Sequence, residues 1–146
     1  MYPWIVRRMI EGALRSQARG DPGPLLSKAA DDVHFVFPSD SSWAADIHGK
    51  AEIELWIRRF MEVGLQFDPQ EIVVSGWPWD TSIYIYFTDH ATDANGDVVC
   101  ENRGVIRGKI AWGKTKSYAA YEDTQKVAAF DQYLASLKAD AQAGAP

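Results

Sequence analysis

Cysteine is almost absent from this 146-residue chain, since Cys100 is the only one. No internal disulfide can form, and nothing in the thiol content points to an oxidising compartment. Long apolar runs are missing as well, and Arg7 and Arg8 interrupt the N-terminal segment, so we predict neither a signal peptide nor a membrane span and expect a cytoplasmic location. Lys and Arg total 15 against 20 Asp and Glu, a net charge of −5. This deficit of positive charge excludes nucleic acid as the expected partner.

Patterns for metal and phosphate binding are also lacking. The three histidines, His34, His48 and His90, lie far apart in the sequence, and none of them pairs at the spacing of a helical metal site. Gly104 and Gly108 fall inside a predicted strand, where glycine permits a bend or bulge, so they do not form a phosphate-binding loop. We therefore expect no metal site.

The composition that remains is that of an ordinary globular protein. Apolar residues make up 47% of the chain and charged residues 24%, and the length suits one domain with a core of useful size. We predict a single domain over residues 1–137. Residues 138–146, rich in Ala and Gly, are expected to form a flexible tail.

Apolar residues recur every three or four positions in several segments, which predicts amphipathic helices. The last of these begins at Asp123 or Thr124, either of which is a favourable N-cap. The predicted helices cover residues 2–18, 24–30, 49–63 and about 123–137.

The remaining segments alternate between apolar and polar residues, which predicts strands. In the first of them, Val33, Phe35 and Phe37 share one face, and residues 39–47 after it are expected to form a polar loop. Helices that lead into one sheet indicate an α+β fold in which a curved, mainly antiparallel sheet wraps the helices. The predicted strands cover residues 33–37, 71–77, 82–92, 98–112 and 115–121.

A strongly curved sheet has a concave face that helices cover only in part, so we expect a pocket for a small, flat or apolar molecule. Aromatic residues at strand spacing also pack in ordinary cores, and this alternative stays open for each of them. The predicted ligand-binding residues are Phe35, Phe37, Trp43, Trp56, Tyr84, Tyr86, Tyr118 and Tyr121.

The order of segments carries a family resemblance. Gly20-Asp21-Pro22, Leu25-Leu26 and Pro38 punctuate a helix, a short helix, a strand and a loop before the next helix, and Tyr121-Glu122-Asp123-Thr124 ends the last strand. In this order the chain resembles the nuclear transport factor-like proteins, which include ketosteroid isomerases, limonene epoxide hydrolases and SnoaL-like polyketide cyclases. The resemblance implies a cone-shaped, cystatin-like mixed sheet around three to four helices, a small-molecule ligand and a homodimer formed through the outer sheet face.

The resemblance to ketosteroid isomerases does not extend to their catalytic groups. Where those enzymes place an Asp base, an oxyanion Tyr and a proton-donating Asp, this chain has Phe37, Ala13 and a residue near Val105. Apolar residues cannot form a proton shuttle or an oxyanion hole. The steroid isomerase mechanism is therefore not expected.

The resemblance to limonene epoxide hydrolases implies a water-activating Asp ten residues after the Gly of the last hairpin. Counting from Gly113 gives Asp123. These enzymes also need an Arg and a second Asp in the preceding strand, where this chain offers Asp89 and His90 as imperfect substitutes. This chain therefore matches only one of the three catalytic residues that epoxide hydrolysis requires.

The resemblance to SnoaL-like cyclases implies acid–base catalysis by an acidic pocket residue, with no metal or organic cofactor. Asp123 is the candidate for that role, supported by Arg103 or His90. Two alternatives remain: Asp123 only caps a helix, and Arg103 forms an ion pair on an exposed sheet. We expect cofactor-free chemistry of the cyclase, isomerase or hydrolase type, or else a non-catalytic ligand-binding or dimerisation module.

Overall fold

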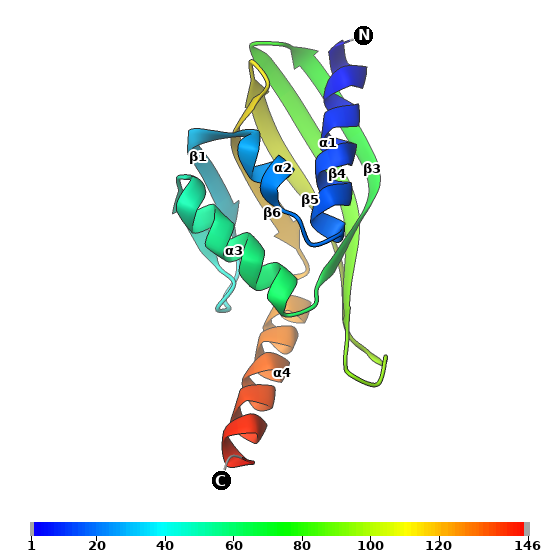
Figure 1. The fold of residues 1–146 in the computed structure, drawn as a ribbon, viewed down its shortest axis with the longest axis vertical. Coiled ribbons are helices and arrows are strands. Elements are labelled where there is room, and N and C mark those ends of the chain that lie inside the picture. The colour runs from blue at the N-terminus through cyan, green and yellow to red at the C-terminus, as the bar shows by residue number, and fades with distance from the viewer. Residues whose placement is uncertain (1, 145–146) are drawn as a thin grey trace.

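The computed structural model describes residues 2–144, in which helices cover the concave face of one curved sheet (Figure 1). The elements in chain order are α1 (Tyr2–Ala18), α2 (Gly23–Ser27), β1 (Ala29–Phe37), β2 (Ala45–His48), α3 (Lys50–Glu62), β3 (Gln66–Trp77), β4 (Asp80–Thr92), β5 (Val98–Ala111), β6 (Lys114–Glu122) and α4 (Thr124–Ala143). The predicted α+β class is confirmed.

The six strands are ordered β2-β1-β6-β5-β4-β3, and the sheet stays open at its two edges. The β1–β6 pair is parallel and the other pairs are antiparallel, so the sheet is mixed. The long antiparallel strands β3 to β6 form the bent part of the sheet, against which α1 lies (Figure 1). This bend creates the hollow that holds the candidate functional site.

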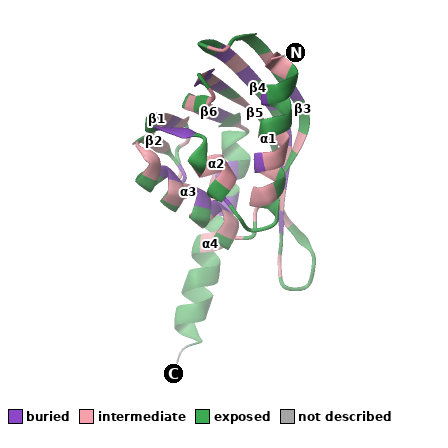
Figure 2. Ribbon diagram, turned by 45° about the horizontal axis from the view of Figure 1, so that its top comes forward, coloured by how far each residue is buried: buried purple, intermediate pink, exposed green. Residues whose placement is uncertain are grey.

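The core lies between the sheet and the helices because one face of each inner strand is mainly apolar. Val33, Phe35 and Phe37 of β1 are buried, as their alternation predicts. They pack in one cluster with Ile53 and Ile57 of α3. Figure 2 shows that the buried residues follow the strands and the inward faces of the helices. The hydrophobic effect thus fixes which face of each strand the helices cover.

Four segments differ from the sequence-based expectation. Residues 29–30, expected in the second helix, begin β1, and β3 starts at Gln66 rather than at residue 71. Residues 45–48, expected in a loop, form the edge strand β2, in which Ala45 and Ile47 pack against the core and Asp46 and His48 are exposed. Four residues are too few for this alternation to stand out in the sequence. α4 runs to Ala143 rather than ending at Leu137, because Ala-rich segments favour helix even without a core to cover. Its last turns are exposed and project away from the sheet (Figure 2).

Among residues 2–144, no helix combines the length and the apolar character that crossing a membrane requires.

Candidate functional site

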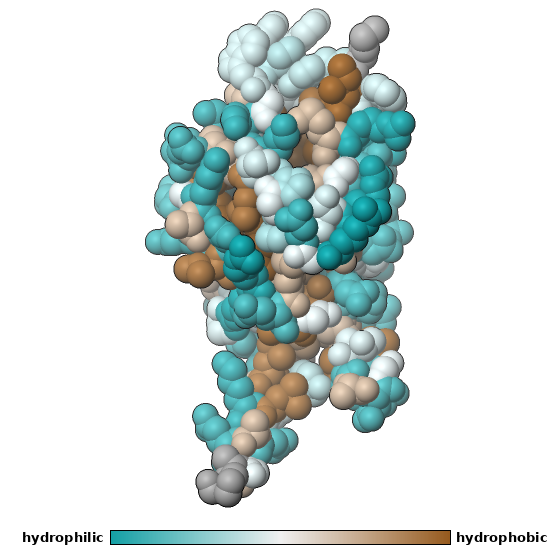
Figure 3. All heavy atoms as spheres, viewed as in Figure 1, coloured by the Kyte–Doolittle hydropathy of each residue, from teal (hydrophilic) through white to brown (hydrophobic). Residues whose placement is uncertain are grey.

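A cavity of about 160 Å³ lies between the helices and the concave face of the sheet. Its walls are almost entirely apolar, and its few polar side chains include Glu122 and Tyr118 at the sheet and Gln17 and Lys28 at the helical side. On the face shown in Figure 3, polar side chains cover the helices and apolar ones show between them. The apolar lining includes Val6, Met9, Ile10, Ala13, Leu14, Leu25, Leu26, Phe35, Phe37, Ile53, Trp56, Ile57, Phe60, Phe67, Ile83, Ile85, Phe87, Ile106, Ile110 and Ala120.

Four of the predicted ligand-binding residues line this cavity: Phe35, Phe37, Trp56 and Tyr118. The ring of Phe35 contacts Trp56 and Tyr118, with ring centres 4.8 and 4.6 Å apart. Burial raises the pKa of Tyr118 far above its usual value, so its hydroxyl stays protonated and available as a donor. A fifth predicted residue, Trp43, lines a smaller adjoining pocket of about 30 Å³.

The structure corrects the predicted placement of the other three aromatic residues. Tyr84, Tyr86 and Tyr121 lie on the outer, convex face of the sheet, where they are 39–52% exposed. In β4 the inward positions are taken by Ile83 and Phe87, among others, and side chains alternate along a strand. The neighbouring tyrosines therefore cannot reach the cavity.

The same alternation places two predicted catalytic residues outside. Arg103 pairs across the strands with Thr88, and His90 pairs with Glu101, in positions that point away from the concave face. Their inward neighbours are Asn102 and Asp89, both buried. Arg103 and His90 thus have no place at the cavity.

Asp123 is the N-cap of α4, the alternative that its sequence context left open. Its exposed carboxylate accepts hydrogen bonds from the backbone N–H groups of Gln125 and Lys126, at 3.0 and 3.3 Å. It is not part of the cavity lining. Its catalytic role stays a prediction, and its position outside the cavity does not support that role.

The acidic groups that do reach the hollow are Asp89 and Glu122. They project inward from β4 and β6, and Glu122 lines both the cavity and the smaller pocket, whereas Asp89 lines the smaller pocket. The two carboxyl groups lie close enough for each to shift the pKa of the other. Two ionised carboxylates at close range repel each other, which favours a proton on one of them.

Burial, the largest cause, and the neighbouring Asp89 carboxylate together raise the pKa of Glu122 from an ordinary 4.5 to about 8. Burial also raises the pKa of Asp89, although its interaction with Glu122 and the nearby His90 act in the opposite direction. None of the ion pairs within residues 2–144 involves either group. With a pKa of about 8, Glu122 is mostly protonated at neutral pH.

Neutral polar groups complete the surroundings of this carboxyl pair. The Asn102 amide donates to a Glu122 carboxyl oxygen at 3.3 Å and to the backbone carbonyl of Asp123 at 3.1 Å. The Cys100 thiol, which also lines the smaller pocket, has its pKa raised to about 11 by burial and by the two acids, so it is not an activated nucleophile. Asp89 Oδ1 and the indole N–H of Trp43 have no hydrogen-bond partner among residues 2–144, and both residues line the smaller pocket.

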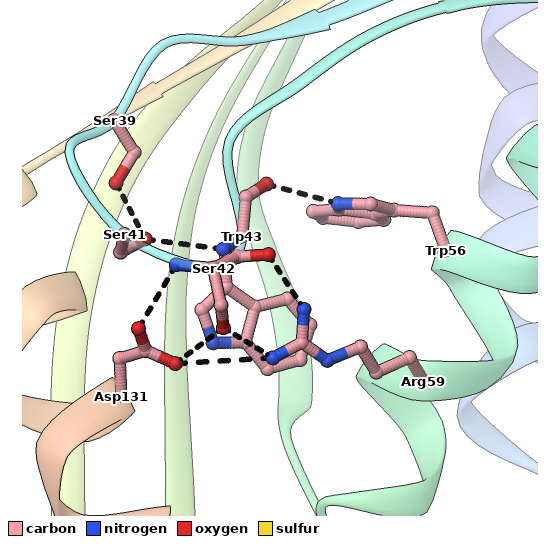
Figure 4. A network of polar contacts seen from close by, with 7 residues as sticks. All are labelled: Ser39, Ser41, Ser42, Trp43, Trp56, Arg59 and Asp131. Atoms are coloured by element: carbon pink, nitrogen blue, oxygen red, sulfur yellow. Dashed lines mark hydrogen bonds and ion pairs between the residues drawn. The ribbon is translucent and has the colours of Figure 1, made fainter.

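The loop before β2 forms hydrogen bonds with α3 and α4, and these contacts fix the position of Trp43 (Figure 4). Asp131 of α4 accepts hydrogen bonds from the backbone N–H and the hydroxyl of Ser42, and Arg59 of α3 donates to the Ser42 carbonyl at 2.7 Å. The Arg59 guanidinium lies 3.8 Å from the centre of the Trp43 ring. The Trp56 indole donates to the Trp43 carbonyl at 3.1 Å, which joins this loop to the cavity wall.

Glu122 was missed although it stands in the Tyr121-Glu122-Asp123 motif that carries the family resemblance. The signal that could have found it is phase: in β6 the inward residues are Tyr118, Ala120 and Glu122, spaced by two. Tyr118 and Tyr121, both predicted to line the pocket, stand three positions apart in a strand, so they face opposite sides. Because Tyr118 and Tyr121 were both predicted to line the pocket, the sequence alone did not determine which face of β6 points inward.

No protein-family model matches the sequence, and no curated protein matches it either. Solved structures do resemble it. An NTF2-like protein of unknown function from Burkholderia pseudomallei has a TM-score of 0.70 at 20% identity, over 84% of this chain and 93% of that one. TerC, co-crystallised with polyporic acid, has a TM-score of 0.67 at 18% identity, over 82% and 92% of the two chains.

A candidate polyketide cyclase from Xanthomonas campestris pv. campestris is similar too, with a TM-score of 0.65 at 16% identity over 88% of this chain and 98% of that one. Identities this low establish a shared fold and nothing about chemistry. The chain has the NTF2-like fold, as its segment order predicted.

Proposed function

We propose that the chain binds a small, mainly apolar molecule in its cavity and catalyses cofactor-free acid–base chemistry on it through the Glu122–Asp89 pair. The observation that carries the proposal is a carboxylic acid, kept protonated near neutral pH, at the boundary of a mainly apolar cavity. Titratable pairs with strongly shifted pKa values cluster at catalytic sites.

The pair suits reactions in which one proton is given and then taken back. Protonated Glu122 donates to an oxygen of the bound molecule, such as a carbonyl or epoxide oxygen. Two adjacent carboxylates then remain, and their mutual repulsion favours prompt return of a proton to Glu122. Isomerisation, aldol-type cyclisation and epoxide opening all include such a step. The unpartnered Asp89 oxygen and Trp43 N–H offer hydrogen bonds to a polar group in the smaller pocket.

The size of the cavity limits the substrate. An apolar cavity of about 150 Å³ in another protein binds benzene, so the 160 Å³ found here holds a guest of about one ring. The names of two structural neighbours agree with a small organic ligand, since one is a candidate polyketide cyclase and the other was crystallised with polyporic acid.

Deuterium uptake next to the carbonyl of one-ring enolisable ketones tests this proposal, because it follows proton exchange by NMR without requiring the natural substrate. The wild-type protein is expected to accelerate uptake, and Glu122→Gln to lower the rate by about 10²–10⁴-fold, the usual contribution of a general acid or base. Since the protonated form is the donor, the wild-type rate falls as pH rises through about 8.

Asp123→Asn is the matched control, because asparagine also caps helices well and the side chain lies outside the cavity. Its rate is expected to equal that of the wild type. A rate lost in Asp123→Asn but kept in Glu122→Gln would return the catalytic role to Asp123. Tight binding of one-ring ketones without any exchange would instead support the non-catalytic ligand-binding module.

We further propose that two copies of the chain pair through the outer sheet face. Tyr86, Val105 and Tyr121 lie side by side across β4, β5 and β6, and all three are 39–52% exposed. Val73 and Tyr84 form the next apolar pair beside them. An apolar stripe on a sheet is typical of a surface that another protein covers.

Sedimentation velocity at micromolar concentration is expected to show a dimer for the wild type and a monomer for Tyr86→Lys, because the new charge has no partner in a self-complementary interface. Leu55→Lys is the control, since Leu55 is exposed on α3, away from this stripe. A wild-type monomer would contradict the proposal, as would equal weakening by both substitutions.

A further inference from the structure

Two histidines and an aspartate form a cluster on the outer side of the β1–β2 hairpin, away from the cavity. In the antiparallel register His34 stands directly opposite His48, and Asp46 stands opposite Val36, two positions further along. Cross-strand partners and residues two apart share one face of a sheet, so the three side chains project together. Their ligand atoms all lie within 4.8 Å of one another.

The cluster brings two imidazole nitrogens and a carboxylate oxygen close together, and a tilt of the stacked rings would let both nitrogens point at one ion. The two imidazole rings are parallel, with centres 4.1 Å apart and planes inclined by 8°. Both present Nε2 to the same oxygen, Asp46 Oδ1, at 2.5 Å for His34 and 3.7 Å for His48. Two imidazole nitrogens and a carboxylate oxygen are a donor set that Zn²⁺ and neighbouring divalent ions prefer.

We propose that His34, Asp46 and His48 bind a divalent transition-metal ion of the Zn²⁺ class at the surface of the β1–β2 hairpin. With bonds of about 2.1 Å, ligand atoms of a tetrahedral zinc site lie about 3.4 Å apart. The His48–Asp46 separation already fits. The His34–Asp46 separation must open by about 1 Å, which the Asp46 side chain can supply because it is 73% exposed and free to turn.

The surroundings favour an ion at this position. Lys50, the basic residue that follows β2, is paired with Asp31 at 3.5 Å. On the other side of β1, the neighbouring strand β6 places the small residues Ser117 and Ala119 beside His34 and Val36. The backbones are held by the strand ladder and by the hydrogen bond from Gly49 N–H to the Val33 carbonyl, at 2.8 Å. Three protein ligands leave a coordination position open to water or to another molecule.

Titration of the full chain with Zn²⁺ tests the site, using protein without an affinity tag because a tag would bind the metal itself. Isothermal titration calorimetry is expected to show one Zn²⁺ per wild-type chain, and thermal unfolding to shift upward when Zn²⁺ is added. His34→Asn and His48→Asn each remove one ligand and are expected to weaken binding by at least about tenfold. Asp46→Asn replaces the charged ligand and is expected to weaken binding as well.

His90→Asn is the matched control, because His90 lies on β4 and outside the cluster. It is expected to bind Zn²⁺ as the wild type does. The proposal is overturned if the wild type shows no saturable binding below millimolar Zn²⁺, if His90→Asn weakens binding as much as the hairpin variants, or if both hairpin histidine variants bind like the wild type. Thermal unfolding without zinc checks that each variant is folded, and His48→Gln replaces any asparagine variant that is not.

Discussion

Replacing Glu122 by glutamine is expected to stabilise the protein at alkaline pH, by an amount that grows between about pH 5 and 8. In the folded protein Glu122 has a pKa of about 8, against an ordinary 4.5. Between these values the folded state keeps a proton that the unfolded chain has released, so wild-type stability falls as pH rises, by up to about 1.4 kcal/mol per pH unit. Above about pH 8 the loss is complete.

Glutamine removes this dependence because it carries no titrating proton, and its amide can still donate to Asp89. The free energy of unfolding of Glu122→Gln should therefore exceed that of the wild type by several kcal/mol at pH 8.5 and by much less at pH 5. Urea unfolding at four pH values between 5 and 9 measures the difference. This experiment reports on the buried carboxyl pair whether or not the pair catalyses a reaction.

Glu101→Gln provides the matched control, since Glu101 is an exposed glutamate on the outer face of β5. Its stability is expected to stay within about 0.5 kcal/mol of the wild type at every pH, as is usual for surface substitutions. Parallel curves of stability against pH for the wild type and Glu122→Gln would show that Glu122 titrates normally, and the acid–base proposal would lose its main support.

The fold was predictable from sequence because its signals are redundant. Helix periodicity, the glycines of the hairpin turns and the apolar alternation of Val33, Phe35 and Phe37 all point to the same architecture. β2 was missed because its alternation of Ala45 and Ile47 with Asp46 and His48 spans only four residues, within a segment that is otherwise polar. The end of α4 was misplaced because its last turns have no core to cover.

The candidate site was harder to predict, because it depends on which way each strand faces. A shift of one residue exchanges the two faces of a strand. In β4 and β5, large aromatic or charged side chains such as Tyr84 and Arg103 stand outward, and the inward residues near the site are the polar Asp89 and Asn102. Hydrophobicity alone therefore selects the wrong face there. The histidine cluster depends on pairing across a hairpin that includes the unpredicted strand β2, so sequence spacing could not show it.

Gly104→Ala is expected to be among the most destabilising single changes in the chain. Gly104 stands opposite Glu122 in the β5–β6 ladder. A Cβ atom there would lie 2.2 Å from the Tyr121 carbonyl oxygen, 2.8 Å from Glu122 Cγ and 3.0 Å from Phe87 Cζ. The first of these contacts is with backbone, which cannot turn aside as a side chain can. We expect a loss of about 2–3 kcal/mol or more in the free energy of unfolding, as for other overpacked cores.

Gly12→Ala is the matched control for this prediction, because the same substitution meets open space. Apart from its chain neighbours and the backbone of its own helix, no heavy atom of residues 2–144 lies within 4 Å of a Cβ built on Gly12 in α1. Alanine is favoured over glycine inside a helix by about 0.5–1 kcal/mol. Urea unfolding should therefore move in opposite directions for the two variants. Equal urea midpoints for Gly104→Ala and the wild type would mean that β5 and β6 can move apart without a loss of stability. The close contact between Glu122 and β5 would then not be fixed. The hydrogen bond from Asn102 to Glu122 would not be fixed either.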